Sequence, residues 1–341
     1  MNISDRLQEL AILRQLALER FNAGQYRNLS ELFNGIADEL EDALRGRPLT
    51  EFAGRNLDRQ IAELISLVQV PTPELQELPG VEARWAVSSL AVVGVDAVLP
   101  PASALASMAE TTLIQGAVLS GWMGQLNRQI RFDIERTVRS GVTLGRTNQQ
   151  IAKDILGIQA QGDKGAEPLK RARRDAMALT RTAVQTFANQ AILETYRANE
   201  DVLRGVEYVA TLDSRTTPQC AALDGAVWDL EGNYLSGPKL PFAVPPIHWQ
   251  CRSRLSPVTK TFRELGIDVD EIPEGERASA YGPVSGGMKF ETFMERQGPE
   301  FAEKVLGKGR YELYKTKNLT LAQLIDPRTL TPLTLAELRE L

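Results

Sequence analysis

The chain has few of the side chains on which disulfide scaffolds and many metal sites depend. Its 341 residues include two cysteines, Cys220 and Cys251, and one histidine, His248. Two cysteines cannot build a disulfide framework, so stability has to come from buried apolar surface. The apolar fraction of 43% is sufficient for such cores and excludes a fully disordered chain. The length corresponds to about two domains of ordinary size.

Blocks of like charge are missing as well. The chain has 39 lysines and arginines and 44 aspartates and glutamates, which gives a net charge of −5. An electrostatic coat for DNA or for an anionic membrane needs clustered basic residues that displace counterions. Such a coat is therefore excluded, and any contact with nucleic acid has to be local.

Long apolar runs are also absent. The most apolar region, residues 86–122, is interrupted by charged residues and prolines, so it falls short of the roughly 18 apolar residues of a spanning helix. We interpret it as a buried helix. The first ten residues lack the basic-then-apolar pattern of a signal peptide. These features predict a protein with no stable membrane span that is made in a reducing cytoplasm.

Helical periodicity dominates the first two hundred residues. Gly141 predicts the end of one helix, and Thr147 with Gln150 predicts a capping box at the start of the next. The apolar faces belong to the core of this chain or pack against a neighbouring subunit. The periodic positions are Ile3, Leu7, Leu10, Leu13 and Ala17; Leu57, Ile61, Leu64 and Val68, with Thr50 as a cap; Leu126, Ile130, Ile134 and Val138; and Ala172, Ala176, Leu179, Ala183 and Phe187.

The pattern changes near Gly205 to short β-like pieces. Residues 206–211 have the β-branched and aromatic content of a strand, Asp224-Gly225 indicates a tight turn, and residues 226–228 are a candidate returning strand. Residues 267–287 are rich in glycine, proline, serine and glutamate and are interpreted as an exposed connection.

The C-terminal part returns to short helices. Phe290, Phe293 and Met294, followed by Phe301 and Val305, predict a pair of helices interrupted at Gly298-Pro299. Two further short helices are expected behind threonine caps. The caps are Thr320, three residues before Gln323, and Thr334, three residues before Glu337.

These patterns predict a mainly α protein: a helical N-terminal two-thirds, a small α+β module of short strands and loops, and short C-terminal helices. Three prolines and a glycine mark a break near 68–81 within the N-terminal part. The predicted division is 1–140 for the N-terminal helical region, 141–200 for a helical lead-in, 201–260 for the module with short strands, and 261–341 for a C-terminal extension.

The histidine and both cysteines fall within 32 residues of the β-like module. His248 and Cys251 have the H-x-x-C spacing that lets two ligands reach one tetrahedral metal, with Cys220 as a third. This indicates a structural zinc site, for which Asp213, Asp224 or water is the fourth ligand. The alternative interpretation has no metal: both cysteines are small buried apolar side chains, and His248 is hydrogen-bonded within the loop.

An enzyme interpretation has some chemical basis. Cys220 as nucleophile, His248 as base and Asp213 or Asp224 as the orienting group form a sufficient set. The sequence has no Gly-rich phosphate loop, no H-E-x-x-H motif and no paired carboxylates beyond ordinary helix surfaces. We therefore predict that the protein is not an enzyme. Both aspartates are expected to form turns, and Arg215 and Arg252 to brace the loop.

A basic cluster lies at the start of the long helix predicted over 169–199. It contains Arg171, Arg173 and Arg174 beside Lys170. Such a cluster is either a solvated helix face or a contact site for phosphate or an acidic partner surface. The sequence leaves both interpretations open.

Several runs of the β-like module stand in a recognisable order and spacing. They resemble the signature of the phage Mu F-like head morphogenesis proteins, the minor capsid proteins of tailed bacteriophages, and the resemblance covers about residues 141–341. The runs are Thr211-Leu212-Asp213-Ser214-Arg215-Thr216, Cys220, Leu223-Asp224-Gly225, Pro245-Pro246-Ile247-His248 and Cys251-Arg252-Ser253.

The residues of this chain that correspond to the family signature can be named one by one. Some family members have two further cysteines, where this sequence has Thr217 and Ser253, and their loss removes two thiolates from a zinc site. The signature positions, to which the resemblance assigns a structural role, are Asp213, Arg215, Cys220, Asp224, Gly225, Pro246, His248, Cys251 and Arg252.

The resemblance implies a minor virion protein, assembled in the host cytoplasm and located in the head interior or at the portal vertex. It implies a role in head morphogenesis, DNA packaging or DNA ejection. The portal protein is the expected main partner, with the major capsid protein, packaged DNA and further copies of the chain as others. Two alternatives stay open: a metal-assisted hydrolase or nuclease that acts during infection, and an internal virion protein that is ejected.

Overall fold

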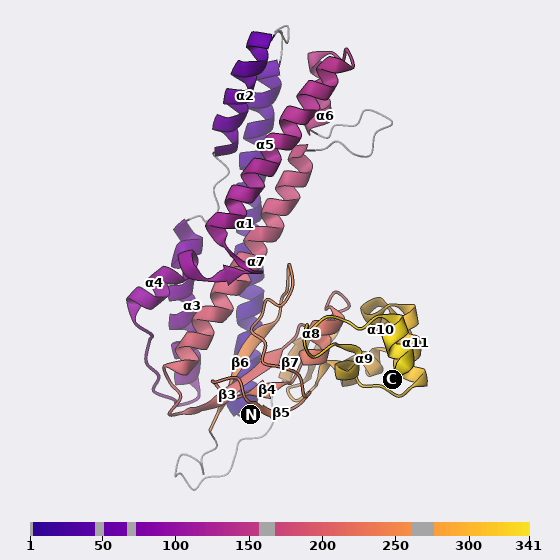
Figure 1. The fold of residues 1–341 in the computed structure, drawn as a ribbon. Helices are drawn as coiled ribbons and strands as arrows, with labels where there is room; N and C mark the ends of the chain where they lie inside the picture. Colours follow the sequence, from indigo (N-terminus) through magenta and orange to yellow (C-terminus); the bar gives the residue numbers. More distant parts are fainter. Residues whose placement is uncertain (1–2, 45–50, 67–72, 157–167, 261–275) are drawn as a thin grey trace. The chain divides into compact units, whose positions relative to one another are not determined.

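The structure is a computed structural model that describes residues 3–44, 51–66, 73–156, 168–260 and 276–341. It is mainly α-helical with a few short antiparallel strands, which confirms the predicted fold class (Figure 1). None of the described helices combines the length and the apolar character needed to span a membrane. The chain forms two compact units: unit 1, which consists of Met1–Leu18, Glu77–Met108 and Gln185–Leu341, and unit 2, which consists of Glu19–Gln76 and Ala109–Val184.

Unit 2 is a bundle of helices that run alongside one another (Figure 1). Polar contacts join them: Arg181 pairs with Glu19, Arg171 Nη1 lies 3.3 Å from Asp133 Oδ2, and Asn148 Nδ2 donates to the Leu44 carbonyl. The helices are α1 (Ile3–Leu44) from Glu19 onward, α2 (Glu51–Ser66), α5 (Leu119–Thr143), α6 (Asn148–Leu156) and α7 (Pro168–Arg197) as far as Val184; a short hairpin of β1 (Leu113–Ile114) and β2 (Ala117–Val118) precedes α5.

Most of the predicted apolar faces are buried. All five predicted positions of α7 are buried, as are Ile61 and Leu64 of α2 and the α5 positions from Ile130 to Val138. Thr50, Val68 and the side chain of Leu57 lie outside the described residues.

The stripe predicted for α1 is wrong at Leu13, which is 50% exposed. The buried apolar positions of this part are Ile3, Leu7, Ala11 and Leu18. Two successive steps of three residues, as from Leu7 to Leu13, rotate a helix face by about 120° at 3.6 residues per turn. Leu13 therefore leaves the face on which Leu7 lies.

Two predictions for the region between residues 68 and 122 differ from the structure. Helix α3 (Pro73–Val92) begins inside the break predicted near 68–81 and contains Pro79. Residues 68–72 lie outside the described part. The region 86–122, expected to be a buried helix, is instead divided between the end of α3, a turn, α4 (Ala102–Thr111) and the β1–β2 hairpin. Val98, Leu99 and Leu113 are 48–60% exposed, because the interrupting prolines and glycines end the helices.

Helix α5 continues past Gly141 to Thr143, and Gly145, at φ +67°, follows its end. The prediction that Gly141 stops the helix is wrong because this glycine serves packing: a Cβ there would lie 2.5 Å from Ile151 Cγ1 of α6. The predicted capping box of α6 is confirmed. Thr147 N–H donates to Gln150 Oε1, and Gln150 N–H donates to Thr147 Oγ1.

Gly141→Ala is expected to destabilise unit 2 by about 1–3 kcal/mol, because its methyl group overpacks the contact with Ile151. Gly124→Ala in the same helix is the matched control. Its methyl would meet only the flexible end of Arg128 at 3.4 Å, so the better helix propensity of alanine makes that variant neutral or more stable. Urea unfolding of both variants measures the difference, and equal stabilities would contradict the packing role.

Unit 1 contains the β-like module as a four-stranded antiparallel sheet in the order β5-β4-β3-β6. Its strands pair Val206 with both Trp228 and Pro257. The core beside the sheet contains the fully buried Tyr208 and Trp228. The strands are β3 (Leu203–Val209), β4 (Val227–Trp228), β5 (Tyr234–Ser236) and β6 (Arg254–Thr259), and α8 (Pro218–Leu223) lies between β3 and β4.

A buried ion-pair network joins three parts of unit 1. The Glu82 carboxylate of α3 is fully buried and accepts from Arg14 of α1 at 2.7 Å and from Arg254 of β6 at 3.0 Å. The Arg254 guanidinium also lies over the Trp85 ring, 5.2 Å from its centroid. Because the charges are paired where water is excluded, losing one partner would leave the others uncompensated.

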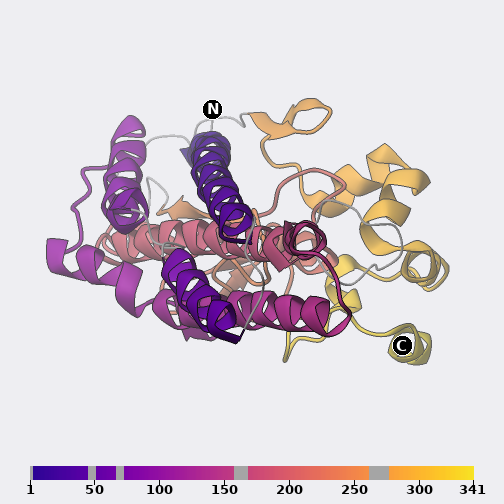
Figure 2. The same cartoon turned by 90° about the horizontal axis from the view of Figure 1, so that it is seen from above.

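The C-terminal extension packs as short helices that lie together in both views (Figures 1 and 2). The predicted helix pair around Gly298 is confirmed, as are the capping boxes at Thr320 and Thr334. Helix α11 was not predicted from the sequence. The elements are α9 (Phe290–Gln297), α10 (Pro299–Leu306), α11 (Lys308–Thr316), the 3₁₀ turn η1 (Leu321–Leu324) and α12 (Leu335–Glu340).

Part of the connection predicted over 267–287 is a hairpin of β7 (Glu276–Ser279) and β8 (Gly282–Ser285). Residues 267–275 lie outside the described residues. The prediction of an exposed connection is wrong at Arg277, whose side chain is 1% exposed.

Candidate metal centre

Two short elements place the cysteines and the histidine. Thr217 is the N-cap of α8 and Pro218 its first residue, where the missing proline N–H costs no helical hydrogen bond; Cys220 is therefore carried on the first turn and is buried. The loop from Pro246 leads to His248, and Cys251 N–H donates to the His248 carbonyl at 3.3 Å. That single turn explains why residues in an H-x-x-C spacing meet.

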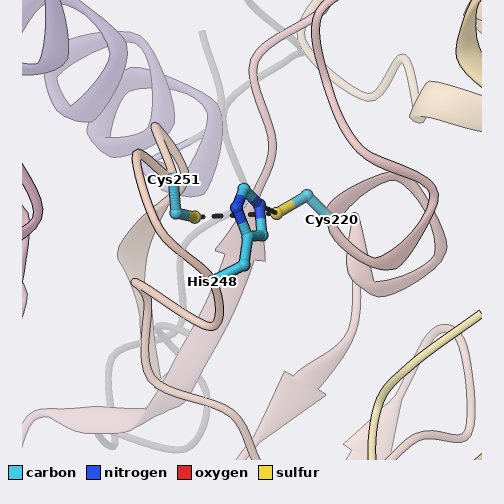
Figure 3. Close-up of side chains that lie close together, drawn as sticks. All are labelled: Cys220, His248 and Cys251. Carbon is cyan, nitrogen blue, oxygen red and sulfur yellow. Dashed lines mark hydrogen bonds between the residues drawn. The ribbon is translucent and has the colours of Figure 1, made fainter. Parts of the chain in front are cut away.

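The three side chains point toward one another (Figure 3). Cys220 Sγ lies 3.2 Å from His248 Nε2 and 3.6 Å from Cys251 Sγ. His248 Nδ1 lies 2.8 Å from the Trp249 carbonyl, which can only accept, so Nδ1 carries the proton. When the ring is neutral, the lone pair of Nε2 is directed at the thiols, as a metal-binding imidazole requires.

The distances fit a zinc ion. With Zn–S near 2.3 Å and Zn–N near 2.0–2.1 Å, tetrahedral geometry places two sulfurs about 3.8 Å apart and a sulfur and a nitrogen about 3.6 Å apart. The measured 3.6 Å and 3.2 Å are shorter by a few tenths of an ångström. All ligand atoms of the group lie within 4.8 Å of one another.

The cluster favours one negative sulfur. Burial alone would raise the pKa of Cys251, but hydrogen bonds from Cys220 and His248 and the charge of the imidazolium hold it well below the ordinary thiol value. Burial, reinforced by the neighbouring Cys251, raises the pKa of Cys220. Burial would lower the pKa of His248, yet its contact with Cys251 raises it. A divalent cation would displace the protons from Cys220 and His248.

Tyr208 is a further member of the cluster that the sequence analysis missed. Its hydroxyl lies 3.2 Å from Cys220 Sγ and 3.9 Å from Cys251 Sγ. Burial and the nearby sulfurs raise the pKa of Tyr208 well above its ordinary value, so it stays a phenol. The alternation of β3, in which Val206 and Tyr208 are both fully buried, was the signal that could have revealed it.

Asp213 is not among the clustered ligand atoms. Its carboxylate accepts two hydrogen bonds from the Arg252 guanidinium, at 2.5 and 2.7 Å, and one from the Arg215 N–H at 3.0 Å. Burial would raise the pKa of Asp213, but these bonds and the charge of Arg252 hold it below the ordinary value. Arg252 braces the loop beside Cys251 through this pair.

Asp213→Asn is expected to lower stability at neutral pH, because the amide cannot reproduce the ionic pair with Arg252. The depressed pKa of Asp213 means that its stabilisation is complete above the unfolded value of about 3.8 and is lost as the pH falls through the folded pKa. The stability difference between parent and variant should therefore shrink in acid. Urea unfolding between pH 7 and pH 2.5 measures it, and a constant difference would contradict the assignment.

Asp224 does more than form a local turn. Its carboxylate accepts from the distant N–H groups of Ala210 and Phe290, at 2.7 and 2.8 Å, and pairs with Arg277 at 2.8 Å. The turn expected at Asp224 therefore does not account for these hydrogen bonds, which join segments distant in the sequence. Gly225, at φ +84°, does make the predicted turn. Because Arg277 also donates to the Met288 carbonyl, this pair fastens the start of α9 to the sheet.

The basic cluster at the start of α7 contacts groups of this chain. Arg171 lies near Asp133, Arg173 donates to Ser30 Oγ at 2.6 Å, and Arg174 lies near Asp175. These contacts fall within unit 2. A contact with phosphate or with a partner surface stays a prediction.

Residues 132–256 match the family model described as Phage Mu protein F like protein. Over this segment the chain is similar to the phage Mu F-like proteins. The match includes β3, the first three residues of β6 and all three residues of the Cys-His-Cys cluster, and it confirms the resemblance recognised from the sequence as far as residue 256. It relates the protein to bacteriophage heads. Comparison with curated proteins and with solved structures gives no match.

Proposed function

We propose that this Mu F-like protein is a minor head protein of a tailed phage that acts in head morphogenesis at or near the portal. The observation that carries the proposal is the family match, which spans most of the sheet and the Cys-His-Cys cluster. The charges of the module support a role in assembly. Asp213 is held by Arg252 and Asp224 by Arg277, so neither carboxylate is free to act as a catalytic base.

The portal protein is the proposed main partner, and the major capsid protein, packaged DNA and further copies of the chain are secondary ones. The net charge of −5 favours protein surfaces over DNA as the main source of affinity. Roles in packaging and ejection would follow from a location at the portal vertex.

A stop codon early in the gene tests this proposal in the phage that encodes it. Heads assembled without the protein should be defective or unfilled while tails form normally, and supplying the protein in trans should restore filled heads. Antibody detection should find the protein in purified heads and in complexes with the portal. Normal yields of infectious particles without the protein would overturn the proposal. Its presence or absence in heads after DNA release distinguishes a retained assembly protein from an ejected one.

The second part of the proposal is that Cys220, His248 and Cys251 hold a structural zinc ion. The sulfur and nitrogen spacings fit the ion, and the proton on Nδ1 leaves Nε2 available. Zinc would join α8 to the loop before β6, two segments that otherwise meet at this point through buried thiol contacts and the hydrogen bond between Thr217 Oγ1 and His248 Nε2.

A further inference from the structure

A small pocket of about 20 Å³ lies beside the cluster. Cys220 and His248 form part of its lining, and the remaining lining is polar. This volume is about that of one water-sized probe, and a buried water needs two to four polar partners. The other lining residues are Thr211, Arg215, Thr216, Thr217, Gln250, Arg252 and Ser253.

We propose that the zinc centre is open: three ligands come from the protein, and the fourth position faces this pocket and binds water or a small thiolate. This inference rests on the zinc site proposed above. It adds an exchangeable ligand to that site and names its chemical class.

The protein has no suitable fourth ligand in the described part of the chain. No further carboxylate, thiol or imidazole joins the three clustered groups there. The Tyr208 hydroxyl is engaged with the sulfur of Cys220 at 3.2 Å, and both oxygens of Asp213 bond Arg252. Thr217 Oγ1 lies 3.0 Å from His248 Nε2, but a neutral hydroxyl is not one of the side-chain groups by which proteins hold zinc. An open fourth position is the arrangement found in zinc sites that keep an exchangeable ligand.

Charge and size define the external ligand. Two thiolates balance the charge of Zn²⁺, and Arg252 is balanced by Asp213. The Arg215 side chain, 76% exposed at the pocket, adds positive charge that favours an anion. Because the pocket has room for about one heavy atom, the donor has to be a single atom on a narrow chain. Sulfur suits a borderline-soft ion, so a small thiolate fits best.

Cobalt substitution of the full-length protein tests the inference, because the sulfur-to-cobalt charge-transfer absorption grows with the number of bound thiolates. The parent should bind one Co²⁺ with the absorption of two thiolates. Added 2-mercaptoethanol should increase it by about half, from two sulfur ligands to three, and ethanol should not.

Two variants at one position complete the design. Thr217 is three residues before Cys220, so Thr217→Cys creates a C-x-x-C pair at the N-terminus of α8. That variant should show the absorption of three thiolates without any additive and no response to 2-mercaptoethanol. Thr217→Val, which removes the hydroxyl and adds no donor, should respond like the parent.

The outcomes separate the two proposals. A parent that binds Co²⁺ tetrahedrally and ignores 2-mercaptoethanol has a closed site, which overturns this inference and leaves the zinc site standing. A response to 2-mercaptoethanol that appears only in Thr217→Val would make Thr217 the fourth ligand of the parent and overturn it too. A parent that binds neither Co²⁺ nor Zn²⁺ overturns the zinc proposal and the open position with it.

Discussion

Replacing Asp224 with alanine is expected to lower the free energy of unfolding by about 3–5 kcal/mol, because it leaves a buried guanidinium without its partner. The Asp224 and Arg277 side chains are each 1% exposed, so water cannot take the place of the carboxylate. The N–H groups of Ala210 and Phe290 would also lose their acceptor. Urea unfolding followed by tryptophan fluorescence measures the loss, since Trp228 is buried in the same unit.

Two further variants show that the effect belongs to the buried charge. Asp224→Asn keeps an acceptor oxygen and should lie between the parent and Asp224→Ala. Glu300→Ala breaks the solvent-exposed pair with Lys304 and should leave the unfolding midpoint nearly unchanged. If Asp224→Ala unfolds at the same urea concentration as Glu300→Ala, the proposed role of the buried pair is wrong.

Cys251→Ala is expected to abolish stoichiometric zinc binding and the stability that the metal provides. With free zinc a thousand-fold above its dissociation constant, that stability is about 4 kcal/mol. Metal analysis of the purified protein gives the zinc content, and thermal unfolding with and without a chelator gives the contribution to stability. The chelator should lower the midpoint of the parent and leave that of the variant unchanged.

Alanine at 251 distinguishes the metal interpretation from the apolar one. If Cys251 is only a small buried apolar side chain, its replacement leaves a small cavity whose cost does not depend on zinc. Without a shared metal, His248→Ala and Cys251→Ala should change the midpoint of thermal unfolding by different amounts. A shared metal instead makes the midpoints of both variants insensitive to the chelator. Equal responses of parent and variants to the chelator would contradict a structural zinc site.

Local signals in the sequence predicted most of the elements. The face of α7, the capping boxes at Thr147, Thr320 and Thr334, and the helix pair around Gly298 depend on residues within a few positions of one another, so their spacing is sufficient evidence. The errors arise where the role of a residue depends on a contact with a residue that is distant in the sequence. Gly141 was interpreted as a helix stop because Ile151 of the next helix was not visible as its packing partner.

In the candidate site too, features set by local spacing were predicted and features set by distant contacts were missed. The spacing of His248 and Cys251 within one turn indicated a shared ligand set, and the structure brings Cys220 to both. The hydrogen bonds of Asp224 could not be found in this way, because Arg277 is 53 residues away in a segment with the composition of an exposed loop. Tyr208 is buried by the pairing of β3 with two strands that are distant in sequence.

The Glu82–Arg254 pair has a consequence for synthesis on the ribosome. The two residues are 172 positions apart, so α3 leaves the exit tunnel long before its counterion has been translated. The nascent carboxylate has to remain hydrated until then, since burying it alone would be costly. The stretches of unit 2, by contrast, are all translated by Val184. We therefore expect the helical bundle of unit 2 to fold co-translationally. Unit 1 can fold completely only after the last third of the polypeptide has been translated.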